Sequence, residues 1–123
     1  MIPQYQETTE RLEKDEQKTV ISWLRDAEIP HFAVPNEQGR NRAFAMANMR
    51  SQMGCLKGAP DIVIIRLAPS NRRPTAIEMK SRTGTLSVEQ KRVHVTMRAE
   101  GWNIIVGFGA VDTISKLRAI GYQ

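Results

Sequence analysis

The 123-residue sequence predicts a single α/β domain with a mixed central β-sheet and helices on both faces of that sheet. Three apolar runs have the length of buried strands: residues 62–67, 75–81 and 103–108. A polar turn separates the first two runs, which favours an antiparallel hairpin. A helical pattern separates the second run from the third, which favours a right-handed crossover between parallel strands.

The chain is predicted to begin with a long helix. We expect this helix over residues 8–28, because Val20 and Leu24 have the spacing of one buried helical face. Either Thr8 or Thr9 is available to cap its N-terminus.

A short extended segment and a second helix are predicted next. Residues 31–35 fit an edge strand, since Pro35 has no N–H to donate to a neighbouring strand. A polar loop over residues 36–42 leads into a helix-like stretch over 42–53, which Gly54 ends.

The remaining connections and helices have their own local signals. Residues 55–60 read as a tight connection into the first buried strand. Ser87 and Gln90 have the spacing of a capping box, so they predict the start of a helix that Gly101 closes. A last helix is expected over residues 111–120.

Acidic side chains gather where two of these strands meet. Asp61 opens the first buried run, and Glu78 and Lys80 lie in the second, on the same face because they are two residues apart. The hairpin would bring Asp61 alongside Glu78. Two desolvated carboxylates repel each other, and a hard cation such as Mg²⁺ or Mn²⁺ would offset that cost. This pattern is typical of a phosphodiester hydrolase, although it also fits a surface hairpin with a Glu78–Lys80 ion pair.

The first helix carries further polar residues of interest. Glu13 and Gln17 are four residues apart and continue the buried side of the helix. They either lie at the solvent edge of the core or reach into a polar site. Glu10 and Glu16 fall on neighbouring faces, where contact with solvent is the simpler expectation.

Charge and composition narrow the possible partners. The net charge is +5, and residues 31–60 hold four basic and one acidic side chain, while residues 61–123 hold ten basic and five acidic. This distribution favours a nucleic-acid partner, although a modest positive charge also serves solubility. No apolar stretch reaches the length of a membrane span, and the N-terminus does not resemble a signal peptide.

The few cysteine and histidine residues argue against a zinc site. Cys55 is the single cysteine, which excludes an internal disulfide and suits a reducing cytoplasm. His31 and His94 have no ligand-like spacing, and we expect His94 to be solvated in the middle of its helix. Trp23 and Trp102 are expected to pack in the core or at a dimer contact.

Taken together, the chain resembles the PD-(D/E)xK nuclease superfamily, and within it the virus-type replication-repair nuclease (VRR-NUC) domain. The resemblance runs over about residues 13–121, and its motifs are weak singly but occur in the right order. The matching stretches are Glu13-x-x-x-Gln17, Pro35-Asn36 with Gly39-Arg40, residues 54–61, Ile77-Glu78-x-Lys80, Leu86-Ser87-x-x-Gln90 and Gly101.

The resemblance implies a restriction-endonuclease-like fold for residues 1–123 as one stand-alone domain, and it assigns roles to individual residues. Asp61 and Glu78 would bind the metal together with the backbone carbonyl of Met79. Glu13 would complete the acidic site directly or through a water, and Lys80 would position or activate the attacking water.

Supporting roles are implied for five more residues. Gln17 and Gln90 would hold the site by hydrogen bonds, although the capping box alone also explains Gln90. Asn36, Arg40 and Arg42 are candidates for phosphate contact, with a solvated loop as the simpler alternative. Glu16 is the rival of Glu13 for the acid on the first helix.

The resemblance further implies Mg²⁺- or Mn²⁺-dependent hydrolysis of DNA. Branched DNA, such as a four-way (Holliday) junction, is the expected substrate, and a homodimer is expected to act on it in the cytoplasm of a bacterial host, as a phage or prophage product. In such a dimer, the loop 36–42 and the pair Arg72 and Arg73 would face the DNA. The alternatives are a sequence-tolerant nicking or restriction-like nuclease and a catalytically silent DNA-binding protein of the same fold.

Overall fold

The computed structural model describes residues 2–35 and 52–123, and it describes side chains in the first of these ranges from residue 12 onward. Three helices and four strands lie in these ranges. In chain order they are α1 (Ile2–Asp26), β1 (His31–Ala33), β2 (Ile62–Ile64), β3 (Thr75–Lys80), α3 (Val88–Ala99), β4 (Asn103–Phe108) and α4 (Ala110–Ala119).

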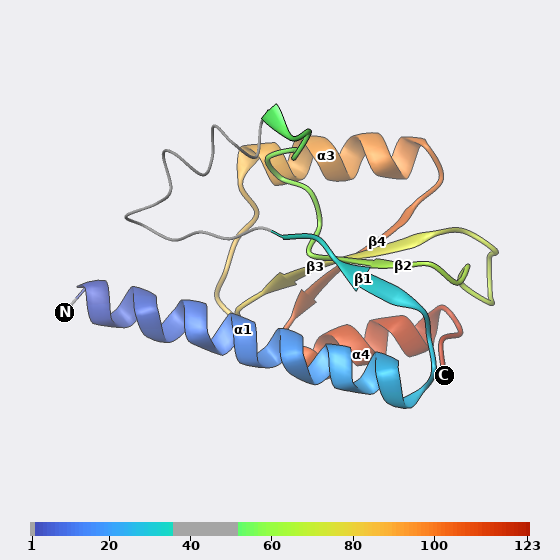
Figure 1. Ribbon diagram of the computed structural model, residues 1–123, viewed down its shortest axis with the longest axis horizontal. Helices are drawn as coiled ribbons and strands as arrows, with labels where there is room; N and C mark the ends of the chain where they lie inside the picture. The colour runs from blue at the N-terminus through green and yellow to red at the C-terminus, as the bar shows by residue number, and fades with distance from the viewer. Residues whose placement is uncertain (1, 36–51) are drawn as a thin grey trace.

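The four strands form one mixed sheet in the order β1-β2-β3-β4 (Figure 1). β1 pairs with β2 and β2 with β3 in the antiparallel direction, whereas β3 and β4 are parallel. The helix α3 connects the two parallel strands, as the crossover rule requires. The predicted mixed sheet, hairpin and parallel crossover are therefore confirmed.

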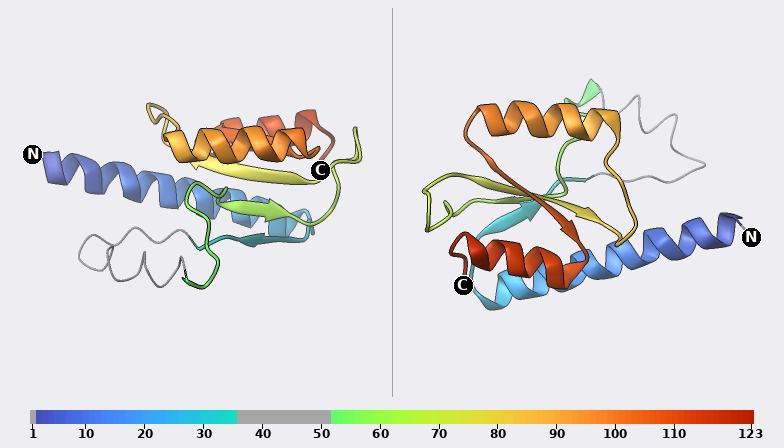
Figure 2. Two further views of the ribbon diagram at one scale, coloured as in Figure 1. Left: turned by 90° about the horizontal axis from the view of Figure 1, so that it is seen from above. Right: turned by 180° about the vertical axis from the view of Figure 1, so that it is seen from behind.

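Helices cover both faces of the sheet, as predicted. Figure 1 shows α3 on one face and α1 with α4 on the other, and the view from behind in Figure 2 agrees. The main hydrophobic core lies between the sheet and the α1–α4 layer. Its fully buried members include Val20 and Leu24 of α1, Ile62 and Ile77 of the hairpin and Leu117 of α4. Each such side chain contributes about 1.5–3 kcal/mol through burial.

Several element boundaries differ from the predictions, and two of them differ by more than two residues. α1 begins at Ile2 rather than at residue 8, so Thr8 and Thr9 lie inside the helix and do not cap it. No residue in this stretch disfavours a helix except Pro3, which the first turn tolerates because the N–H that proline lacks would have no helical partner there. β2 ends at Ile64 rather than at residue 67, although the N–H of Ile65 still donates to the carbonyl of Pro30 in the register of β1 and β2.

Other local predictions are confirmed. β1 lies at the edge of the sheet, and β4 has the predicted bounds. Ser87 and Gln90 make both hydrogen bonds of the capping box at the start of α3. The predicted loop 36–42 and nearly all of the helix 42–53 lie outside the described residues. Within the described part of the chain, no helix combines the length and apolar character that crossing a bilayer requires.

Candidate active site

The hairpin brings Asp61 and Glu78 together, as the sequence predicted. Ile62 pairs with Ile77, so the residues on either side of this pair, Asp61 and Glu78, share the opposite face of the sheet, toward α3. The N–H of Asp61 donates to the carbonyl of Ile77 (2.9 Å), and Oδ2 of Asp61 accepts from the N–H of Met79 (2.7 Å). The carboxyl groups of Asp61 and Glu78 are joined by a hydrogen bond.

The environment of Glu78 strongly disfavours its charge. Its side chain is only 2% exposed to solvent. The pKa of Glu78 is raised to about 9, chiefly by burial and then by the charge and hydrogen bond of Asp61, with a smaller contribution from Glu13. Lys80 acts in the opposite direction. At neutral pH the site therefore needs either a shared proton or a bound cation.

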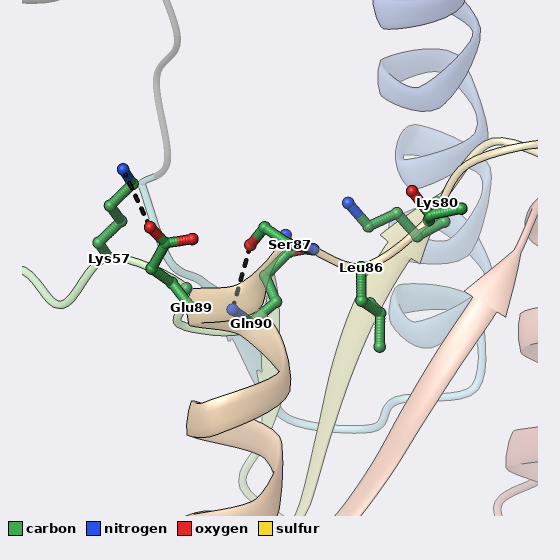
Figure 3. A pocket seen from close by; sticks show the side chains of 8 residues that line it. Lys57, Lys80, Leu86, Ser87, Glu89 and Gln90 are labelled. Carbon is green, nitrogen blue, oxygen red and sulfur yellow. Dashed lines mark hydrogen bonds and ion pairs between the residues drawn. The ribbon is translucent and has the colours of Figure 1, made fainter.

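Lys80 stands at the end of β3, two residues beyond Glu78 and on the same face. It lines a cleft of about 470 Å³ between the end of β3 and the start of α3 (Figure 3). Lys57 lies at the other side of this cleft, where its ammonium is 3.4 Å from Oε1 of Glu89. Gln90, which donates to Oε2 of Glu78, also lines this cleft, so one lining residue connects the open space to the acid pair.

Gln90 makes hydrogen bonds both within the capping box of α3 and to the acid pair. Its Oε1 accepts from the N–H of Ser87 (2.9 Å), and its own N–H donates to Oγ of Ser87 (3.1 Å). Its remaining amide group, Nε2, donates to Oε2 of Glu78 (3.2 Å). The capping box is therefore confirmed and Gln90 also contacts Glu78, while its supporting role at a metal site stays a prediction.

The buried position of His94 contradicts the sequence prediction that this residue is solvated. Its ring is 1% exposed, and Nε2 lies 3.3 Å from Oε1 of Glu78. Burial, followed by the charges of Arg98 and Lys80, lowers the pKa of His94, and these effects outweigh the opposing charge of Asp61. The available signal was its position four residues after Gln90, which places both residues on one helical face.

The structure separates the two candidate acids on α1. Oε1 of Glu13 accepts from the N–H of Ser81 (3.0 Å), directly after β3, and its charge affects Glu78. Oε2 of Glu16 instead accepts from the N–H of Ala110 (2.6 Å), at the first residue of α4. Glu13 therefore lies at the acid pair, whereas Glu16 caps another helix. Gln17 is half-buried one turn after Glu13, and its amide makes no hydrogen bond to another described residue.

The donor set suits a hard divalent cation. The N–H of Met79 points at Asp61, and the carbonyl of a strand residue lies on the same side as its N–H, so the Met79 carbonyl faces the acid pair. Within residues 2–35 and 52–123, no three His, Cys, Asp or Glu side chains converge closely enough to hold an ion by themselves. The available protein ligands are therefore the carboxylates of Asp61 and Glu78 and the Met79 carbonyl. Mg²⁺ usually keeps several water ligands when a protein supplies so few.

The described residues do not include the three candidate phosphate contacts, which are Asn36, Arg40 and Arg42. Arg72 and Arg73 lie in the turn before β3, at the opposite end of that strand from Lys80. Five steps of about 3.3 Å place this turn roughly 17 Å away, and the expectation that Arg72 and Arg73 face DNA stays a prediction.

Comparison with known proteins supports the fold. No family model matches the sequence, and no curated protein matches it. Among solved structures, a protein described as "VRR_NUC domain protein" superposes with a TM-score of 0.70 at 21% sequence identity, covering 89% of this chain and 88% of that chain. The predicted restriction-endonuclease-like α/β architecture is thereby confirmed, and the chain has the fold of a VRR-NUC domain protein.

Proposed function

We propose that this chain is a divalent-metal-dependent nuclease that hydrolyses phosphodiester bonds in DNA. One observation carries the proposal: the carboxyl groups of Asp61 and Glu78 are in contact at the end of a hairpin, with Lys80 on the same face. An arrangement this costly in free energy is more typical of a functional site than of a structural one. The VRR-NUC description of the structural neighbour is consistent with it.

Asp61, Glu78 and the Met79 carbonyl would hold Mg²⁺ or Mn²⁺. When bound, the ion supplies positive charge that stabilises the negative charge developing on the phosphate. The raised pKa of Glu78 supports this assignment, because a cation removes the repulsion that now favours its protonated form.

The other residues of the site would bind and orient the attacking water, the end of β3 and the Glu78 carboxylate. The ammonium of Lys80 can donate hydrogen bonds to the attacking water or to a phosphate oxygen at the rim of the cleft. Glu13 holds the backbone of Ser81, so it fixes the end of the strand that carries Lys80. Gln90 holds one oxygen of Glu78, which keeps the carboxylate from rotating.

DNA is the proposed partner because the chain is basic, with 18 Lys and Arg against 13 Asp and Glu. Lys57, Lys80 and Ser87 line the cleft that Gln90 connects to the acid pair, and a DNA strand would approach there. Asn36, Arg40 and Arg42 remain proposed phosphate contacts. We further propose that branched DNA is cut by a homodimer, since two-fold symmetry places two such sites on two strands.

The direct test is cleavage by the purified chain with Mg²⁺ or Mn²⁺. Labelled four-way junction, flap and linear duplex are incubated beside an Asp61→Asn control, with a chelator arm for each. We expect metal-dependent cutting of the branched substrates that the variant lacks. Equal cutting of linear duplex would favour a restriction-like enzyme. Binding without any cutting would overturn the proposal in favour of a silent DNA-binding protein.

A further inference from the structure

The carboxylate of Glu78 receives a partner on each oxygen from a single helix. Gln90 donates to Oε2 (3.2 Å), and Nε2 of His94 lies 3.3 Å from Oε1. Both partners come from α3, one helical turn apart. The His94 ring and the Glu78 side chain are almost completely buried, so water does not compete for either contact.

The second ring nitrogen of His94 decides which tautomer is present. Nδ1 is buried and has no hydrogen-bond partner among the described residues. A proton on Nδ1 would be an orphaned buried donor, and orphaned buried N–H groups are rare in proteins, so the tautomer without a proton on Nδ1 is favoured. The proton belongs on Nε2, where it can be donated to Oε1 of Glu78.

We propose that His94 is a positioning residue, whose Nε2–H holds the Glu78 carboxylate in the orientation that faces Asp61 and a divalent cation. This inference rests on the proposed function to the extent that Glu78 is a metal ligand. The terminal torsion of a glutamate is broad, so an unrestrained carboxylate would sample many planes. Gln90 and His94 fix that plane from two points of one helix, as partners of metal ligands commonly do.

The test measures Mn²⁺ binding by calorimetry on the full chain without DNA, so it does not depend on cleavage. His94→Leu removes the donor, whereas His94→Gln keeps an amide N–H at nearly the same reach. We expect His94→Leu to weaken Mn²⁺ affinity by about 10- to 100-fold and His94→Gln to stay within about threefold of wild type. The Mn²⁺ concentration for half-maximal cleavage should shift by the same factor, with KM for DNA unchanged.

Tyr122→Phe is the matched control for loss of stability. Its hydroxyl is equally buried and donates to the carbonyl of Arg66 and to Oγ1 of Thr75, at the far end of the sheet. This variant should lose stability and keep wild-type Mn²⁺ affinity. If His94→Leu also binds Mn²⁺ as wild type does, the positioning role is wrong. If it loses Mn²⁺ affinity while wild type binds Mn²⁺ but cuts no DNA, the positioning role stands and the nuclease proposal falls.

A measurement on the unmodified protein covers the case in which His94→Leu does not fold. Long-range ¹H–¹⁵N correlation spectra distinguish the two neutral tautomers of a histidine ring. We expect the His94 ring to carry its proton on Nε2. A proton on Nδ1 would overturn the inference, because Nε2 could not then donate to Glu78.

Discussion

The main-chain N–H of Met79 donates a 2.7 Å hydrogen bond to Oδ2 of Asp61. This bond ties the residue before β2 to the second-last residue of β3. It also orients the Asp61 carboxylate toward the edge of β3 on which the Met79 carbonyl lies. The Asp61 carboxylate and the Met79 carbonyl, two of the proposed metal ligands, are therefore held side by side by the backbone of the hairpin. Glu78 directly precedes Met79, and its carboxylate, on the same face of the sheet as Asp61, would be the third ligand.

The raised pKa of Glu78 predicts that the metal-free protein loses stability as the pH rises. The folded-state pKa is about 9 and the ordinary value is 4.5, so between these values the folded protein holds a proton that the unfolded chain has released. The stabilisation is complete below the lower value and is lost as the pH passes the higher one. Its slope reaches about 1.4 kcal/mol per pH unit.

Urea unfolding in the presence of a chelator, at several values between about pH 5 and pH 8, measures this slope. Glu78→Gln has no carboxyl proton to release, so its stability should fall less steeply with pH than that of wild type. The difference between the two proteins isolates Glu78 from the other titrating groups. Parallel curves would show that Glu78 is ionised in the metal-free fold, against the prediction.

Glu13 and Glu16 form a matched pair of acids on α1 with different expected effects. Glu16→Gln weakens a charged cap on the N–H of Ala110 and should lower the free energy of unfolding by about 0.5–2 kcal/mol, with little change in cleavage rate. Glu13→Gln removes negative charge beside Glu78 and should slow cleavage. Rate assays and urea unfolding on both variants provide the check. The assignment fails if Glu16→Gln is the slower enzyme.

Gly58 packs closely against the start of α3, in the connection that leads to Asp61. An added Cβ would lie 2.6 Å from the backbone C and O of Glu89, whereas at Gly54, with nearly the same positive φ, it would meet no atom of the described residues within 4 Å. Gly54→Ala should therefore cost only the backbone strain, about 1–2 kcal/mol. Gly58→Ala adds overpacking of about 1–3 kcal/mol and should displace the connection that leads to Asp61.

Unfolding free energies and cleavage rates of the two alanine variants test this contrast. We expect Gly58→Ala to be the less stable protein and the slower enzyme. Equal losses in both variants would mean that the contact of Gly58 with α3 has no part in placing Asp61.

The sequence predicted the acid pair because local and tertiary rules agree there. The apolar residues Ile62 and Ile77 must share one face, and this parity forces Asp61 and Glu78 onto the other. The turn between the strands then sets which residues meet. The same reasoning predicted the capping box of α3, since Ser87 and Gln90 act within one helical turn.

The remaining parts of the site depend on packing that no local pattern encodes. His94 has charged neighbours along the chain, and its spacing from Gln90 gives it a helical face, but its ring reaches Glu78 only because α3 packs on that side of the sheet. Glu13 and Glu16 are three residues apart on one helix, and the position of the start of α4 decides which of them becomes a cap. Such contacts join residues that are far apart in sequence.

The most direct test of the account is a crystal structure of the full chain grown with Mn²⁺, with data collected for anomalous scattering by manganese. We predict an anomalous peak within coordination distance, about 2.0–2.3 Å, of the carboxylates of Asp61 and Glu78 and of the Met79 carbonyl. A Mn²⁺-saturated crystal in which the two carboxylates still share a hydrogen bond, with no peak between them, would contradict the account.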